Sequence, residues 1–132
     1  MSIKEFLDKI PERYSHLIKR NSPAKQIGNN VPEPIKDVYM YSNGLELPFG
    51  QIFNLSRASV ESTRKPFNSK WYVFGKDNYF TFWLCALKPD NEGLWITSWD
   101  HESGLAIDDE LVWKDLVEFL EDELEEFIEN EE

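Results

Sequence analysis

The sequence predicts an α+β fold in which helices pack on one face of an antiparallel sheet. Three observations predict it. Apolar residues recur with helical spacing at both ends of the chain, strand-like segments separated by turns fill the middle, and no internal repeat or linker divides the sequence. The length of 132 residues fits one domain of about 100–200 residues, so we assign residues 1–132 to a single domain.

The N-terminal segment is predicted to be helical. Ser2 and Glu5 match a capping box at its start. Pro11 lies inside the pattern and predicts a kink or a restart near Ile10, after which residues 21–31 form a surface loop. The residues that share the apolar stripe are Ile3, Phe6, Leu7, Ile10, Tyr14, Leu17 and Ile18.

A second, short helix is predicted from about Glu33 to Ser42. Proline occupies positions 32 and 34, where the first helical turn tolerates it. Asn43-Gly44 follows the last turn, where glycine readily adopts a left-handed conformation.

After Gly44 the apolar period changes to that of strands. Gly75-Lys76-Asp77-Asn78 separates two aromatic runs and predicts a hairpin turn, and residues 56–70 are expected to form a long exposed connection. The strands are expected near residues 52–55, 71–74, 79–85, 94–99 and 104–107.

The alternation of side chains sorts the sheet into two faces. One row is fully apolar and is expected to pack against the helices; it consists of Phe80, Phe82, Leu84 and Ala86. The other row mixes aromatic and polar residues and consists of Tyr79, Thr81, Trp83 and Cys85, beside Trp95, Thr97 and Trp99. Two interpretations stay open. Either Trp83, Trp95 and Trp99 form a partly exposed platform that binds a partner, or a loop or a second layer covers them.

The negative charge is concentrated at the C-terminus. The chain has a formal net charge of −11, yet residues 1–107 contain 13 basic and 12 acidic residues, whereas residues 108–132 contain 13 acidic residues and a single base, Lys114. The sequence is therefore a nearly neutral body with an acidic C-terminal element.

This element is predicted to be an amphipathic helix capped by Asp108 and Asp109. Its apolar stripe consists of Trp113, Leu116, Val117, Leu120, Leu124, Phe127 and Ile128. Its opposite face is either a solvated surface or a patch that steers a basic partner. The candidate partner-binding carboxylates are Glu118, Glu121, Asp122, Glu125 and Glu126, with Glu129 on the same face.

Charge and composition exclude several classes of protein. An acidic chain is a poor nucleic-acid binder, because contact with phosphate requires Lys and Arg. The longest mostly apolar run, residues 79–87, is too short for a membrane helix of about 20 residues. No apolar signal segment follows Met1, and the single Cys85 cannot form an internal disulfide, so we expect a cytoplasmic protein.

Residues that support catalysis are sparse, and we expect no enzyme, no cofactor and no metal site. Asp100-His101-Glu102 is expected to be a loop whose adjacent side chains diverge. Cys85 lies among aromatic residues that disfavour a thiolate, so we do not expect it to pair with His101 as a nucleophile. Nucleotide-binding and hydrolase motifs are absent.

Five segments follow one another along the chain in a characteristic order and spacing. They are Val31-Pro32-Glu33-Pro34-Ile35, Tyr41-Ser42-Asn43-Gly44, Leu47-Pro48-Phe49-Gly50, Val73-Phe74-Gly75-Lys76-Asp77 and Leu116-Val117-Glu118-Phe119-Leu120. This succession of motifs resembles the SUKH superfamily, which includes yeast cell-wall-assembly regulators and many bacterial immunity proteins. The resemblance covers roughly residues 25–125, and the acidic C-terminal extension exceeds the usual pattern.

This resemblance implies an α+β domain without catalytic activity, often the antidote to a co-encoded toxin. We therefore expect an immunity protein that binds a toxin domain with a basic surface, for example a nuclease. The alternative that the resemblance allows is a regulatory or scaffold domain related to cell-wall assembly.

Overall fold

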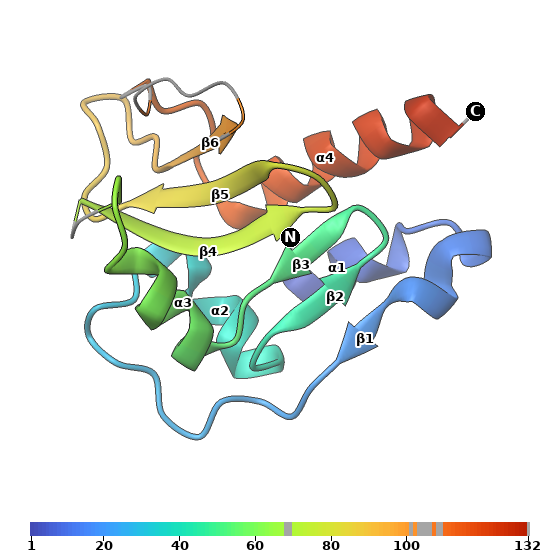
Figure 1. Cartoon of the computed structure of the whole chain (residues 1–132). Coiled ribbons are helices and arrows are strands. Elements are labelled where there is room, and N and C mark those ends of the chain that lie inside the picture. The colour runs from blue at the N-terminus through green and yellow to red at the C-terminus, as the bar shows by residue number, and fades with distance from the viewer. Residues whose placement is uncertain (68–69, 101, 103–106, 108–109, 132) are drawn as a thin grey trace.

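The structure is a computed structural model that describes residues 1–67, 70–100, 102, 107 and 110–131. Within these residues, one antiparallel sheet contains six strands whose order in space follows their order in the chain (Figure 1). The predicted α+β class is thereby confirmed. The strands are β1 (Lys19–Arg20), β2 (Leu45–Leu47), β3 (Gly50–Ile52), β4 (Trp71–Asp77), β5 (Thr81–Ala86) and β6 (Ile96–Asp100).

Helices α1, α2 and α4 lie behind the sheet in Figure 1 and form the second layer of the fold. Helix α3 follows β3 and packs alongside β4, where Ser62 Oγ accepts a hydrogen bond of 2.9 Å from the Val73 N–H. The described helices are α1 (Ile3–Asp8), the 3-10 helix η1 (Glu12–Leu17), α2 (Glu33–Tyr41), α3 (Leu55–Ser62) and α4 (Leu116–Glu131).

The two predicted N-terminal boundaries are confirmed. Ser2 Oγ accepts the Glu5 N–H at 3.1 Å while the Glu5 carboxylate accepts the Ser2 N–H, which completes the capping box. The chain restarts at Pro11 as η1, because proline has no N–H with which to continue α1. Downstream, Gly44 adopts a φ of +93° after α2 ends, as the Asn43-Gly44 signal predicts.

The expectation of an exposed connection over residues 56–70 is wrong, because α3 occupies its first half. Asn54 Oδ1 caps this helix by accepting the Arg57 N–H at 2.8 Å. Only Ala58 is fully buried on α3, so the helix presents too narrow an apolar stripe to be visible as a sequence pattern.

The predicted hairpin turn is also misplaced. β4 continues through Gly75 to Asp77, with a bulge between Val73 and Gly75, and the turn lies at residues 78–80. Asp77 Oδ1 accepts the N–H groups of Tyr79 and Thr81 at 2.8 and 3.0 Å and so fixes the turn three residues later than expected.

The assignment of the two sheet faces is reversed at the centre of β5. Trp83 is completely buried and faces α4, whereas Phe82 on the opposite face is only half-buried and Phe80 is 50% exposed. The reason lies in the neighbouring strands, where Gly50 and Gly75 leave space for the Trp83 indole. The sequence row of Trp83 is therefore the one that meets the helix layer.

The Trp83 indole is the centre of an aromatic core that joins the sheet to α4. Its ring centroid lies 5.3 Å from that of Phe119, edge to face, and 6.1 Å from those of Phe49 and Phe74. Phe119 in turn packs edge to face against Trp113 at 4.8 Å. Ring contacts of this kind add to the free energy gained by burying apolar area.

Helix α4 starts later than its apolar stripe predicts. Trp113 precedes the helix and pairs with Ile96 as an isolated β-bridge. Asp115 Oδ1 accepts the Glu118 N–H at 2.9 Å and caps the first turn. The expected caps, Asp108 and Asp109, and most of the strand expected at 104–107 lie outside the described residues.

We predict that Gly75→Ala destabilises the fold by about 3 kcal/mol, because the added Cβ would lie 2.6 Å from Trp83 Cε3 and against the Gln51 carbonyl oxygen. Urea unfolding monitored by tryptophan fluorescence measures the loss. Gly28→Ala is the control, since its Cβ meets only the flexible Asn30 side chain. Equal free energies of unfolding for the two variants would contradict the role assigned to Trp83.

Candidate partner-binding surface

The acidic face predicted for the C-terminal helix lies on α4. Glu118, Asp122, Glu125 and Glu126 are exposed, and Glu121 is half-buried. The opposite face of the same helix is in the core, where Leu116, Phe119, Leu120 and Leu124 are buried. The structure therefore places the five candidate carboxylates on one element with a fixed orientation.

Two of these carboxylates have partners within the molecule. Lys9 Nζ forms a salt bridge of 3.2 Å with Glu121 Oε2, and the Trp113 indole N–H donates a 2.7 Å hydrogen bond to Asp122 Oδ2. Within the described part of the chain, Lys9–Glu121 is the only salt bridge that α4 makes. The carboxylates of Glu118, Glu125 and Glu126 thus face solvent without a cation from the described residues.

The three candidate tryptophans do not form a common platform. Trp83 is buried against α4, so the expectation that it is exposed for a partner is wrong. Trp95 and Trp99 are half-buried on the other face of the sheet. There the Trp99 ring stacks on Phe82 with centroids 6.3 Å apart and meets Phe67 edge to face at 5.6 Å.

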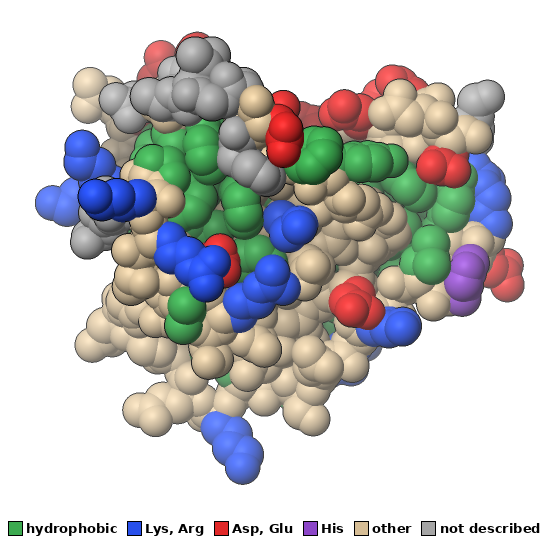
Figure 2. Space-filling view, in the orientation of Figure 1, with side chains coloured by type: hydrophobic (Ala, Val, Ile, Leu, Met, Phe, Trp, Pro, Cys, Tyr) green, Lys and Arg blue, Asp and Glu red, His purple; other side chains and the backbone are tan. Residues whose placement is uncertain are grey.

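Tyr79 and Phe80, which are expected in the two rows of the aromatic strand, instead lie in the β4–β5 turn with exposed side chains. Tyr79 is 73% and Phe80 is 50% exposed, and both adjoin the strand that carries Phe82. Figure 2 shows hydrophobic side chains gathered on the upper part of this sheet face, with Lys and Arg side chains next to them. The sheet face that carries Phe82 is therefore bordered by positive charge, whereas the outer side of α4 carries negative charge.

Sequence reasoning missed Glu123, a half-buried carboxyl at the junction of α4 and the sheet. Its pKa is raised to about 7, mainly because burial disfavours the charged form and also because of the negative charges of Glu126, Asp77 and Asp122. A helical wheel shows the signal, because position 123 lies among the buried positions 116, 119 and 120 rather than on the exposed face.

The structure describes two residues that could serve in catalysis, Cys85 and His16. Cys85 is buried, and desolvation raises the pKa of its thiol to about 12, which disfavours the nucleophilic thiolate. His16 is exposed on η1, and His101 lies outside the described residues. Among the residues that the structure does describe, no group of three or more His, Cys, Asp and Glu side chains is arranged to hold a metal ion.

None of the described helices has the length and apolar character needed to cross a lipid bilayer. Comparison of the chain with protein-family models, with curated proteins and with solved structures finds no match.

We predict that Glu123→Gln stabilises the protein at pH 8 by about 1 kcal/mol and has no effect near pH 4. The folded state holds a proton on Glu123 up to about pH 7, whereas the ordinary pKa is 4.5, so the folded state binds more protons between these values and loses stability as the pH rises through them.

Thermal unfolding from pH 4 to pH 8 measures this difference. Glu129→Gln serves as the control because it removes the same charge from an exposed position of α4. If the two variants show the same pH dependence, the effect comes from the overall charge of the helix and not from the burial of Glu123.

Proposed function

We propose that this chain is a non-catalytic binding protein of the cytoplasm: an immunity protein that neutralises a co-encoded bacterial toxin by binding a basic surface on it. One observation carries the proposal. The carboxylates of Glu118, Glu125 and Glu126 are exposed on α4, a helix whose opposite face packs into the core. No cation among the described residues forms a salt bridge with them.

The energetics of α4 support this interpretation over a role in folding. Glu118–Asp122, Glu121–Glu125 and Asp122–Glu126 are like-charge pairs four residues apart, and each costs about 0.2–0.5 kcal/mol in an isolated helix. Negative charge in the last turns also opposes the helix dipole. A basic partner would neutralise these charges and remove the repulsion, so relief of the repulsion would add to the free energy of binding.

The helix is also fixed well enough to present its charges in a defined arrangement. Trp113 holds Asp122 by a hydrogen bond, and the Phe127 ring packs edge to face on Tyr14 with centroids 5.0 Å apart. A surface that is already ordered loses little conformational entropy on binding. Complementary charge would then speed the encounter and favour the correct partner.

The resemblance to the SUKH superfamily supports the immunity interpretation. One of the segments in the succession that carries it, Tyr41-Ser42-Asn43-Gly44, has a structural role here: Asn43 Oδ1 accepts the Leu55 N–H at 2.9 Å and ties the end of α2 to the start of α3. A nuclease is a suitable toxin class, because a cleft that binds phosphate is basic.

Co-expression with the product of the neighbouring reading frame, followed by affinity capture and a growth assay, tests the proposal. We expect a stable complex and rescue of growth when that product is toxic. A stable complex with a non-toxic cell-wall enzyme would instead favour the regulatory alternative, and reproducible turnover of a substrate by the purified chain would contradict a non-catalytic role.

For the complex, we predict that the triple variant Glu118→Gln, Glu125→Gln and Glu126→Gln slows association about tenfold at low salt and flattens its salt dependence. These residues have no partner among the described side chains, so the fold should remain intact. Stopped-flow fluorescence at several salt concentrations measures the association rate.

The matched control removes three exposed charges from other elements by Glu12→Gln, Glu46→Gln and Glu92→Gln. It leaves the same net charge as the α4 variant. If both triple variants slow association equally, only the overall charge matters and the face of α4 is not the contact surface.

A further inference from the structure

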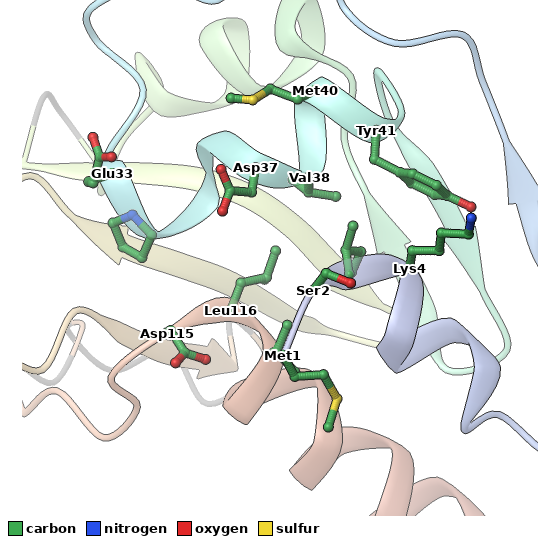
Figure 3. A pocket seen from close by; sticks show the side chains of 13 residues that line it. Met1, Ser2, Lys4, Glu33, Asp37, Val38, Met40, Tyr41, Asp115 and Leu116 are labelled. Carbon is green, nitrogen blue, oxygen red and sulfur yellow. The ribbon is translucent and has the colours of Figure 1, made fainter.

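Helices α1, α2 and α4 meet around a groove of about 670 Å³ on the helix side of the sheet (Figure 3). The start of α1, the length of α2 and the first turn of α4 each contribute a wall. This volume is within the range of about 300–1,000 Å³ that is typical of small-ligand sites, and it can accept several side chains of a partner.

The centre of the groove is apolar. Val38 from α2 and Leu116 from α4 form its floor and are almost fully buried, and Val117 adds to the α4 wall. Met40 borders the groove on α2 and is 60% exposed. Methionine is flexible and polarisable, so it adapts to the shape of an incoming apolar side chain.

Charges divide the groove into two ends. Glu33, Asp37 and Asp115 lie toward one end, and Lys4 lies beside Tyr41 at the other (Figure 3). Lys36 pairs with Glu33 at 3.3 Å, and neither Asp37 nor Asp115 has a salt bridge with a described residue. The acidic end is therefore complementary to a basic side chain.

A second depression also lies beside α4, the helix that carries the acidic face. It has a volume of about 320 Å³ and lies where Leu124 and Ile128 are bordered by Lys9, Glu121 and Glu125. Apolar side chains flanked by carboxylates thus recur from the first turn of α4 to its last turns.

We infer that the groove receives a segment of the partner protein in which an apolar side chain lies next to a Lys or Arg. The apolar side chain packs against Met40, over the buried Val38 and Leu116, and the basic group binds Asp37 and Asp115. This inference rests on the proposed function and deepens it, because it adds a desolvated contact to the charged face of α4 and so determines which basic partner binds tightly.

Three octapeptides, each acetylated and amidated, test the groove without the natural partner. The first is Leu-Lys-Lys-Leu-Leu-Lys-Lys-Leu, the second replaces Leu by Ser, and the third replaces Lys by Glu. Methyl NMR spectra of the full chain report binding at Met40, Val38 and Val117. We expect the first peptide to shift these methyl resonances and the other two to leave them unchanged.

The double variant Asp37→Asn and Asp115→Asn is predicted to weaken the first peptide about tenfold. Asparagine at 115 still caps α4, so the variant keeps the helix start. The control is Glu12→Gln with Glu92→Gln, which removes two exposed charges elsewhere and should not change the affinity.

Several results would overturn the inference. If the Ser peptide shifts the methyl resonances as much as the first peptide does, binding does not require apolar side chains. If the Glu peptide does so, binding does not require basic side chains. Shifts that depend on protein concentration alone would make a second copy of this chain the occupant. If the Asp37→Asn and Asp115→Asn variant binds the first peptide with unchanged affinity, these two carboxylates do not bind its basic groups.

The groove and the proposed function can fail independently. If a toxin is captured but the Asp37→Asn and Asp115→Asn variant binds it with unchanged affinity, the groove inference is wrong and the immunity proposal stands. If no partner is captured while the first peptide still binds at Met40 and Val38, the immunity proposal is wrong, and the groove remains a site for a segment with apolar and basic side chains.

Discussion

The rest of the structure depends on the packing of one indole ring against two glycines. Trp83 covers Gly50 and Gly75 on the inner face of the sheet, and Phe119 of α4 packs on the Trp83 ring from the other side. A Cβ at either glycine would clash with the indole, so the sequence at three distant positions is set by a single contact. This contact fixes α4 against the sheet and therefore fixes which side of the helix faces solvent.

Packing also explains how α4 tolerates so much negative charge. Full burial of a large apolar side chain contributes about 1.5–3 kcal/mol, whereas each like-charge pair on the helix costs about 0.2–0.5 kcal/mol. Leu116, Phe119, Leu120 and Leu124 are all buried, so the core outweighs the repulsion several times over. The outer face is then free to vary for recognition without loss of the fold.

Signals confined to one element were readable from the sequence, and those that depend on distant contacts were not. The capping box at Ser2, the restart at Pro11 and the end of α2 at Gly44 each depend on neighbouring residues. By contrast, Gly75 looks like a turn residue until its pairing with Trp83 is known. The same holds for the candidate site, where the acidic face followed from periodicity but the burial of Trp83 did not.

The backbone pairing between β6 and the segment that leads into α4 has a further consequence for the edge of the sheet. The Ile96 carbonyl accepts the N–H groups of Val112 and Trp113 at 2.9 and 3.1 Å, and the Ile96 N–H donates to the Trp113 carbonyl at 3.0 Å. An outermost strand with unpaired backbone groups is a template on which chains add to one another. Because Val112 and Trp113 pair with Ile96, the segment that leads into α4 also protects this part of the sheet edge from pairing with another chain.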